Sequence, residues 1–108
     1  MRMYIATPIN ARKGRDLREK LVAAKHRIEL LKEVLSNDEQ FKDYELLGTF
    51  DVPHRNDNEI SILGECVTAV LWSDAIYLDH GWQTSKGCNL EYRAAKIYGK
   101  AIYEHDKM

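Results

Sequence analysis

Apolar positions recur along the chain with two different spacings, and these spacings predict its secondary structure. Residues 2–6 form a short, mostly apolar run before Pro8, which is typical of a strand that ends there. From Asp16 onward the apolar positions lie three and four residues apart, which predicts a long helix because one helical face repeats every 3.6 residues. We expect this stripe to cover either a sheet or a neighbouring subunit; it consists of Leu17, Leu21, Ala24, Ile28, Leu31 and Leu35.

The remaining segments alternate between strands and helices. We expect strands at residues 44–50, 75–78 and 100–103, and helices at residues 59–71 and 86–98. Strands that alternate with helices pair in parallel through right-handed crossovers. The order βαβαβαβ therefore predicts one α/β domain over residues 1–108. It would be a three-layer sandwich around a parallel four-stranded sheet, flavodoxin-like or Rossmann-like.

The last predicted helix has clear signals at both ends. Ser85 is a typical N-cap, and Gly99 is a typical stop. Ligands of parallel sheets bind where the strands end, so the loop at 79–85 belongs to the expected binding edge. The residues of this helix expected to face inward are Leu90, Ala94 and Ile97.

Composition and charge exclude several classes of protein. Sixteen Lys and Arg residues against seventeen Asp and Glu residues give a net charge of −1, which argues against a protein that binds nucleic-acid polymers. No apolar run reaches the roughly 18–20 residues that span a bilayer, and the N-terminus does not resemble a signal peptide. Cys66 and Cys88 match no zinc or disulfide pattern. We expect a cytoplasmic protein with no metal, no cofactor and no membrane partner.

Three common catalytic motifs are missing from the chain. There is no GxxxxGK[ST], no GxGxxG after the first strand and no GxSxG. A P-loop nucleotide hydrolase, a dinucleotide-dependent oxidoreductase and an α/β-hydrolase are therefore unsupported.

The segment 81–91 carries the most informative chemistry. Ser85 would cap a helix whose first-turn amides attract an anion, and Gly87 leaves room for a ligand near the backbone. Glu91 follows Gly87 by four residues and so shares its face of the helix. A carboxylate in that place is a candidate nucleophile or base. Taken singly, each residue has a plainer interpretation as a cap, a turn residue or a solvated acid.

Several short motifs resemble the nucleoside 2-deoxyribosyltransferase-like superfamily, and in particular its small bacterial and phage branch described as a domain of unknown function. They are Tyr4–Pro8, Ser73–Leu78, Gly81–Trp82, Ser85–Gly87, Leu90–Tyr92, Ala94–Ala95 and Gly99–Lys100. The resemblance implies cleavage of the N-glycosidic bond of 2-deoxynucleosides or of nucleoside 5′-monophosphates. It also implies a homo-oligomer.

The resemblance assigns roles to individual residues. The catalytic Glu of the superfamily falls on Glu91, and the phosphate-contacting Ser and Gly fall on Ser85 and Gly87. A second acid that protonates the leaving base falls on Cys66, so the adjacent Glu65 is the substitute candidate.

Three further residues are expected to contact the substrate. Trp82 or Tyr4 would stack on the base, and Arg12 would compensate for the Thr7-Pro8 pair that stands where the hydrolase branch has Gly-Ser. Two alternatives stay open: a nucleotide-binding or sensing module without catalysis, and a structural subunit that dimerises through the first helix.

Overall fold

The computed structural model describes residues 1–9, 17–51 and 59–107. Its three helices are α1 (Leu17–Ser36), α2 (Glu59–Trp72) and α3 (Lys86–Ile97), and its four strands are β1 (Arg2–Ala6), β2 (Glu45–Leu47), β3 (Ala75–Leu78) and β4 (Ala101–Glu104). Short 3-10 turns join them, including η2 (Thr49–Asp51) and η3 (Trp82–Thr84). The predicted order of strands and helices is confirmed.

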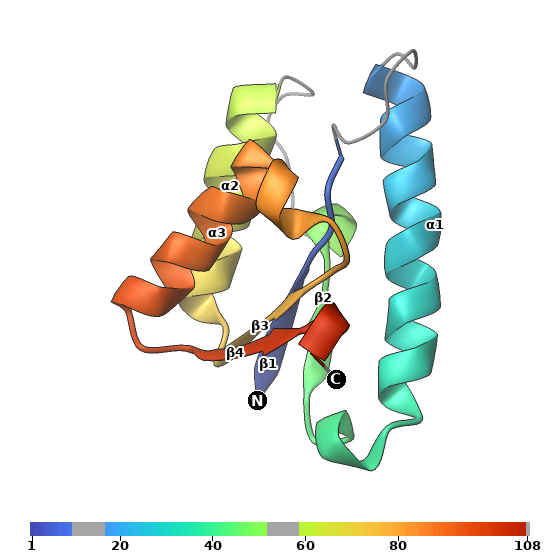
Figure 1. Cartoon of the computed structure of the whole chain (residues 1–108), viewed down its shortest axis with the longest axis vertical. Coiled ribbons are helices and arrows are strands. Elements are labelled where there is room, and N and C mark those ends of the chain that lie inside the picture. The colour runs from blue at the N-terminus through green and yellow to red at the C-terminus, as the bar shows by residue number, and fades with distance from the viewer. Residues whose placement is uncertain (10–16, 52–58, 108) are drawn as a thin grey trace.

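All four strands are parallel, in the order β2-β1-β3-β4. Helix α1 covers one face of this sheet, and α2 and α3 cover the other (Figure 1). The predicted three-layer, flavodoxin-like α/β architecture is therefore confirmed. The chain runs outward from β1 to β2 on one side and to β3 on the other, so the strand order reverses between β1 and β3. The crevice beyond the ends of these two strands is where such sheets bind ligands.

Strict alternation along β1 and β3 divides the core into two halves, because successive strand residues point to opposite faces. Met3 and Ile5 pack on the α1 side together with Tyr77 of β3. Tyr4 and Ala6 pack on the side of α2 and α3. The residues that directly follow β1 and β3 lie at the crevice. The same alternation decides whether each of them points to the α1 side or to the side of α2 and α3.

The apolar stripe of α1 packs against the sheet of its own chain. Ala24, Ile28, Leu31 and Leu35 are buried, and Leu21 is half-buried. Of the two roles expected for this stripe, covering a sheet is therefore the one observed. The strand end approaches α1 closely at Gly48, where an added Cβ would lie 2.6 Å from Cγ2 of Ile28.

Two expectations about the elements need correction. β2 stops at Leu47 and does not extend to residue 50, because the Asp51 carboxylate accepts a hydrogen bond of 2.8 Å from the Gly48 amide and turns the chain. On α3, Leu90 and Ile97 are 48% and 77% exposed. The helix instead buries a different face, formed by Cys88, Glu91 and Ala95.

Candidate functional site

A buried carboxylate forms the centre of the candidate site. Glu91 on α3 is 6% exposed and lies against the core between the sheet, α2 and α3. The Tyr4 hydroxyl of the central strand β1 lies beside this carboxylate, and hydrogen bonding by Tyr4 lowers the pKa of Glu91. The second oxygen, Oε2, is buried and accepts no hydrogen bond among the described residues. Burying an unpaired carboxylate oxygen is unfavourable, and this favours the protonated form of the side chain.

Burial sets the protonation of Glu91. Removal from water disfavours the charged form and raises the pKa of Glu91 from 4.5 to about 7, although the hydrogen bond from Tyr4 opposes this shift. At neutral pH the carboxyl group is therefore close to half ionised. Such a group can exchange a proton or act as a nucleophile near pH 7.

Tyr4 acts through its hydroxyl and not through its ring face. The side chain is fully buried within the core formed with α2 and α3, so its ring is not open to a base and the expected stacking role is wrong. The hydroxyl shares a hydrogen bond of 3.2 Å with Oγ1 of Thr49. Burial, and then the charge of Glu91, raise the pKa of Tyr4 well above its usual value. The phenol therefore stays protonated and remains a donor to Glu91.

Helix α2 contributes Cys66 to the buried cluster formed by Glu91, Tyr4 and Thr49. Cys66 is buried, and burial raises its pKa to about 11 although hydrogen bonding by Tyr4 opposes this shift. The neighbouring Glu65 is half-buried, and its charge also contributes to the raised pKa of Cys66. The two residues of the predicted acid position thus differ in placement: Cys66 is part of the buried cluster, and Glu65 lies beside it.

The amino end of α3 has the expected cap. The Ser85 Oγ accepts a hydrogen bond of 3.3 Å from the Cys88 amide, which confirms Ser85 as the N-cap. Gly87 lies in the first turn, one turn before Glu91. Cys88, buried beside them, has a pKa raised to about 12, chiefly by burial, so it is no thiolate nucleophile.

Asn89 is a structural residue of this end that the sequence reasoning missed. Its Nδ2 donates to the carbonyl oxygens of Gln83 at 2.9 Å and Ser85 at 2.8 Å. These bonds fix the turn η3 onto the first turn of α3. An amide side chain four residues after a predicted cap was the available signal, because Asn readily bonds to nearby backbone.

Trp82 and Arg12 contribute less to the described site. The Trp82 ring is half-buried and lies 4.8 Å from the Tyr92 ring, and its Nε1 donates to Glu104 at 3.2 Å. Most of its contacts therefore serve packing. Arg12 falls outside the described residues.

The chain belongs to a domain family of unknown function, DUF4406, which it matches over residues 1–104. The fold of this chain is a parallel α/β domain of flavodoxin-like arrangement. The search of curated proteins and the search of solved structures each found no match.

Two features are absent from the part of the chain that the structure describes. None of the helices is both long and apolar enough to cross a membrane. Within the same part of the chain, no group of three or more His, Cys, Asp or Glu residues is arranged to hold a metal ion.

Proposed function

We propose that this protein cleaves the N-glycosidic bond of (deoxy)nucleosides or nucleoside 5′-monophosphates, as an N-deoxyribosyltransferase or a nucleotide N-hydrolase. The observation that carries the proposal is the buried Glu91 carboxyl group, with one unpartnered oxygen and a pKa of about 7. The second support is its position one turn after Gly87 on a helix capped by Ser85. That spacing is the one through which the sequence resembles the nucleoside 2-deoxyribosyltransferase-like superfamily.

In the proposed reaction a Glu91 oxygen bonds to the anomeric carbon while the bond from this carbon to the base nitrogen breaks. The electron pair of the broken bond leaves with the base, which takes up a proton from an acid. Water then attacks the anomeric carbon and gives its proton to the acid ionised in the first step, which releases the Glu91 carboxylate and the free sugar or sugar 5-phosphate. In a transferase, a second base takes the place of water. Tyr4 orients the carboxylate throughout by donating its hydrogen bond.

Glu65 is the proposed acid. It lies beside Cys66, whose pKa of about 11 makes the thiol a weak acid at neutral pH. Replacing Glu65 by Gln should therefore slow base release most for substrates whose base is a poor leaving group.

The remaining substrate contacts follow from the amino end of α3. The Ser85 hydroxyl, the backbone at Gly87 and the first-turn amides are proposed to hold a phosphate or a sugar oxygen. Trp82 and Arg12 are proposed to contact the rest of the nucleotide. The reaction would need no cofactor and no nucleic-acid polymer, and we place it in the cytoplasm.

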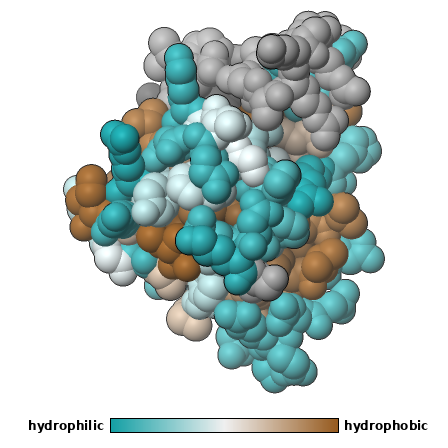
Figure 2. Space-filling view, in the orientation of Figure 1, coloured by the Kyte–Doolittle hydropathy of each residue, from teal (hydrophilic) through white to brown (hydrophobic). Residues whose placement is uncertain are grey.

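We further propose that the protein works as a homo-oligomer. Apolar side chains remain exposed on α1 and on α3 (Figure 2). On α1 they are eight and four residues apart, which places them on one side of the helix. These residues are Val22, Leu30 and Val34, each at least half exposed.

A second function, nucleotide binding without cleavage, is favoured by one observation. The position to which the resemblance assigns the second acid holds the buried thiol of Cys66. A domain with the anion site and Glu91 but without an effective acid would bind a nucleotide and leave it intact.

A chromatographic screen for free base separates the two functions. Deoxynucleosides, ribonucleosides and their 5′-monophosphates are incubated with the protein, and binding is measured in parallel by calorimetry. We expect base release from at least one deoxynucleoside or deoxynucleotide. Saturable binding of a nucleotide with no base release over hours would select the binding module instead, and neither binding nor release would reject both.

A further inference from the structure

A cavity lies on the opposite side of the sheet from Glu91. It has a volume of about 640 Å³ and opens between α1 and the ends of β1 and β3. The residues that line it include Thr7, Lys20, Ala23, Arg27, Asp79 and His80. Its volume falls within the roughly 300–1,000 Å³ typical of small-molecule sites.

The pattern of the chain explains why these residues meet. Alternation along β1 places Thr7 on the same face as Met3 and Ile5, and alternation along β3 does the same for Asp79. The Asp79 amide donates to the Ala6 carbonyl at 3.0 Å, so the two strand ends are held side by side. The cavity therefore lies at the switch point, on the α1 face.

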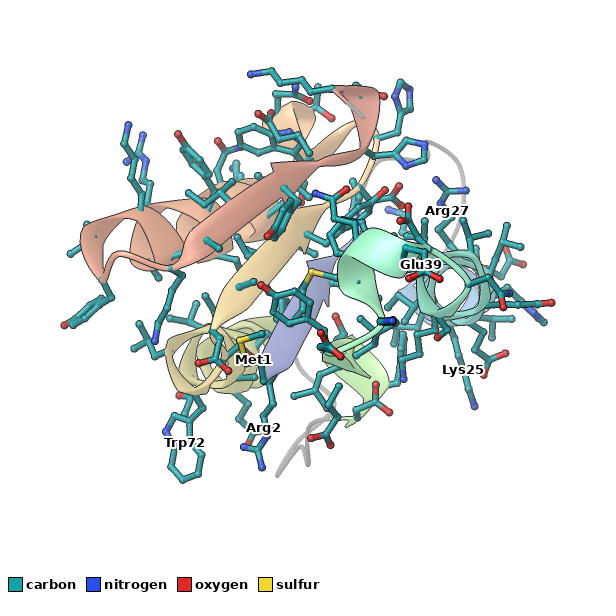
Figure 3. The ribbon with its side chains drawn as sticks, turned by 90° about the horizontal axis from the view of Figure 1, so that it is seen from below. Met1, Arg2, Lys25, Arg27, Glu39 and Trp72 are labelled. Atoms are coloured by element: carbon teal, nitrogen blue, oxygen red, sulfur yellow. The ribbon has the colours of Figure 1, made fainter. Side chains whose placement is uncertain are left out.

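Helix α1 supplies the other wall. Lys20, Ala23 and Arg27 are spaced by three and four residues, so they lie along one side of the helix. The small side chain of Ala23 keeps the space between the two cations open. In Figure 3, Arg27 and Lys25 project from α1 in opposite directions.

The acceptors around the cavity are already occupied. The Asp79 carboxylate is buried and accepts bonds from Arg27 Nε at 2.9 Å and Arg27 Nη2 at 2.8 Å, and also from the His80 amide at 2.7 Å. Both oxygens of Asp106 lie within 3.0 Å of His80 Nδ1. Asp79 and Asp106, which line the cavity, thus both have partners.

The donors, in contrast, are in excess. The Thr7 hydroxyl is buried, with the whole side chain only 8% exposed, and it has no hydrogen-bond partner among the described residues. Over the same part of the chain, Lys20 forms no ion pair and Arg27 Nη1 forms no hydrogen bond. Donors and a positive charge that have no partner among the described residues are suited to an oxyanion.

We propose that this cavity binds a small molecule that carries an oxyanion group, a phosphate or a carboxylate, at a site separate from Glu91. Lys20 and the outer edge of the Arg27 guanidinium contact the oxyanion, and Thr7 contributes a hydrogen bond. Asp79 holds Arg27 in the orientation that presents this edge.

The test is a titration followed by amide chemical shifts at Ala23 and Gly81. Inorganic phosphate and succinate are added separately to the full chain at constant ionic strength, with sodium chloride as the reference salt. Saturable shifts with either anion are expected, and the anion that produces them identifies the group. Saturation with neither anion would overturn the proposal.

Two matched variants test the assignment to Lys20. Lys20→Gln should weaken binding about tenfold or more, since a hydrogen bond to a charged group is lost. Lys25→Gln removes an exposed cation on the other side of the same helix and should leave binding unchanged. Equal weakening by both variants would mean that the anion is held by general charge attraction, and this would contradict a specific anion site at Lys20.

A third variant tests the location and separates this site from Ser85. Ala23→Leu fills the cavity and should abolish the shifts at Gly81, whereas Ser85→Ala should leave them unchanged. Binding that survives Ala23→Leu, or that shifts only Gly87 and Cys88, would place the anion elsewhere and overturn the proposal.

Discussion

The Tyr4 hydroxyl on β1 lies beside the Glu91 carboxylate on α3, and its hydrogen bonding favours the ionised form of that carboxylate. Thr49, beyond the end of β2, holds the same hydroxyl at 3.2 Å. Two buried polar side chains thus orient a carboxylate whose other oxygen has no partner among the described residues. A fixed, half-ionised carboxylate of this kind is suited to chemistry at a carbon centre.

The raised pKa of Glu91 predicts a loss of stability with rising pH. The folded chain holds the proton up to about pH 7, while an unfolded Glu loses it near 4.5. Between these values the folded state binds more protons, so the free energy of unfolding falls as pH increases, by about 3 kcal/mol in total. Urea unfolding from pH 4.5 to 8 measures this. Glu91→Gln should remove the slope, and parallel curves for both proteins would contradict the prediction.

Tyr4→Phe should raise the pKa of Glu91 further. The hydrogen bond from Tyr4 favours the ionised carboxylate and lowers its pKa, so its loss strengthens the effect of burial. The phenyl ring keeps the packing of the core. The carbon-13 shift of the Glu91 carboxyl, followed against pH, measures the change. An unchanged or lower midpoint would show that Tyr4 does not position this group.

Arg27→Met should destabilise the fold by about 2–3 kcal/mol. It leaves the buried Asp79 carboxylate without its two-point partner, and the loss is smaller than for a fully buried pair because Arg27 is partly exposed. Adding Asp79→Asn should recover part of the loss. Lys25→Met, on the exposed side of α1, serves as the control in urea unfolding. Similar losses for both single variants would rule out a specific role for the ion pair.

Two glycine replacements should change stability in opposite directions. Gly48→Ala forces its Cβ to within 2.6 Å of Ile28 Cγ2 and should destabilise by about 1–3 kcal/mol. Gly64→Ala, in α2 with no atom within 4 Å of the added Cβ, should stabilise by up to about 1 kcal/mol because Ala favours helix. Thermal unfolding of both variants tests the packing of α1 against the end of β2. The same sign for both would contradict it.

The sequence predicted the fold well because periodicity is a direct consequence of strand and helix geometry. The stripe of α1, the strand at 75–78 and the Ser85 cap all follow from local rules. The inward face of α3 could not be predicted in this way. Its apolar residues Leu90 and Ile97 are exposed, and the polar Glu91 is buried.

The reason lies in contacts that are distant in sequence. Glu91 is buried facing a hydroxyl that is 87 positions earlier in the chain, and no local pattern contains that pairing. Places where a polar group displaces an apolar one from the core are often functional. The failure of the apolar pattern on α3 thus supports a functional role for Glu91. This is the residue that its spacing from Ser85 and Gly87 had already indicated.

The rate of base release by wild-type protein and by Glu91→Gln, on the best substrate from the screen, tests the central claim most directly. Glu33→Gln, which removes an exposed carboxylate from α1, is the matched control. We expect Glu91→Gln to lose at least about a thousandfold in kcat while still binding the substrate, since the nucleophile is removed, and Glu33→Gln to match wild type. Wild-type turnover by Glu91→Gln would contradict the account.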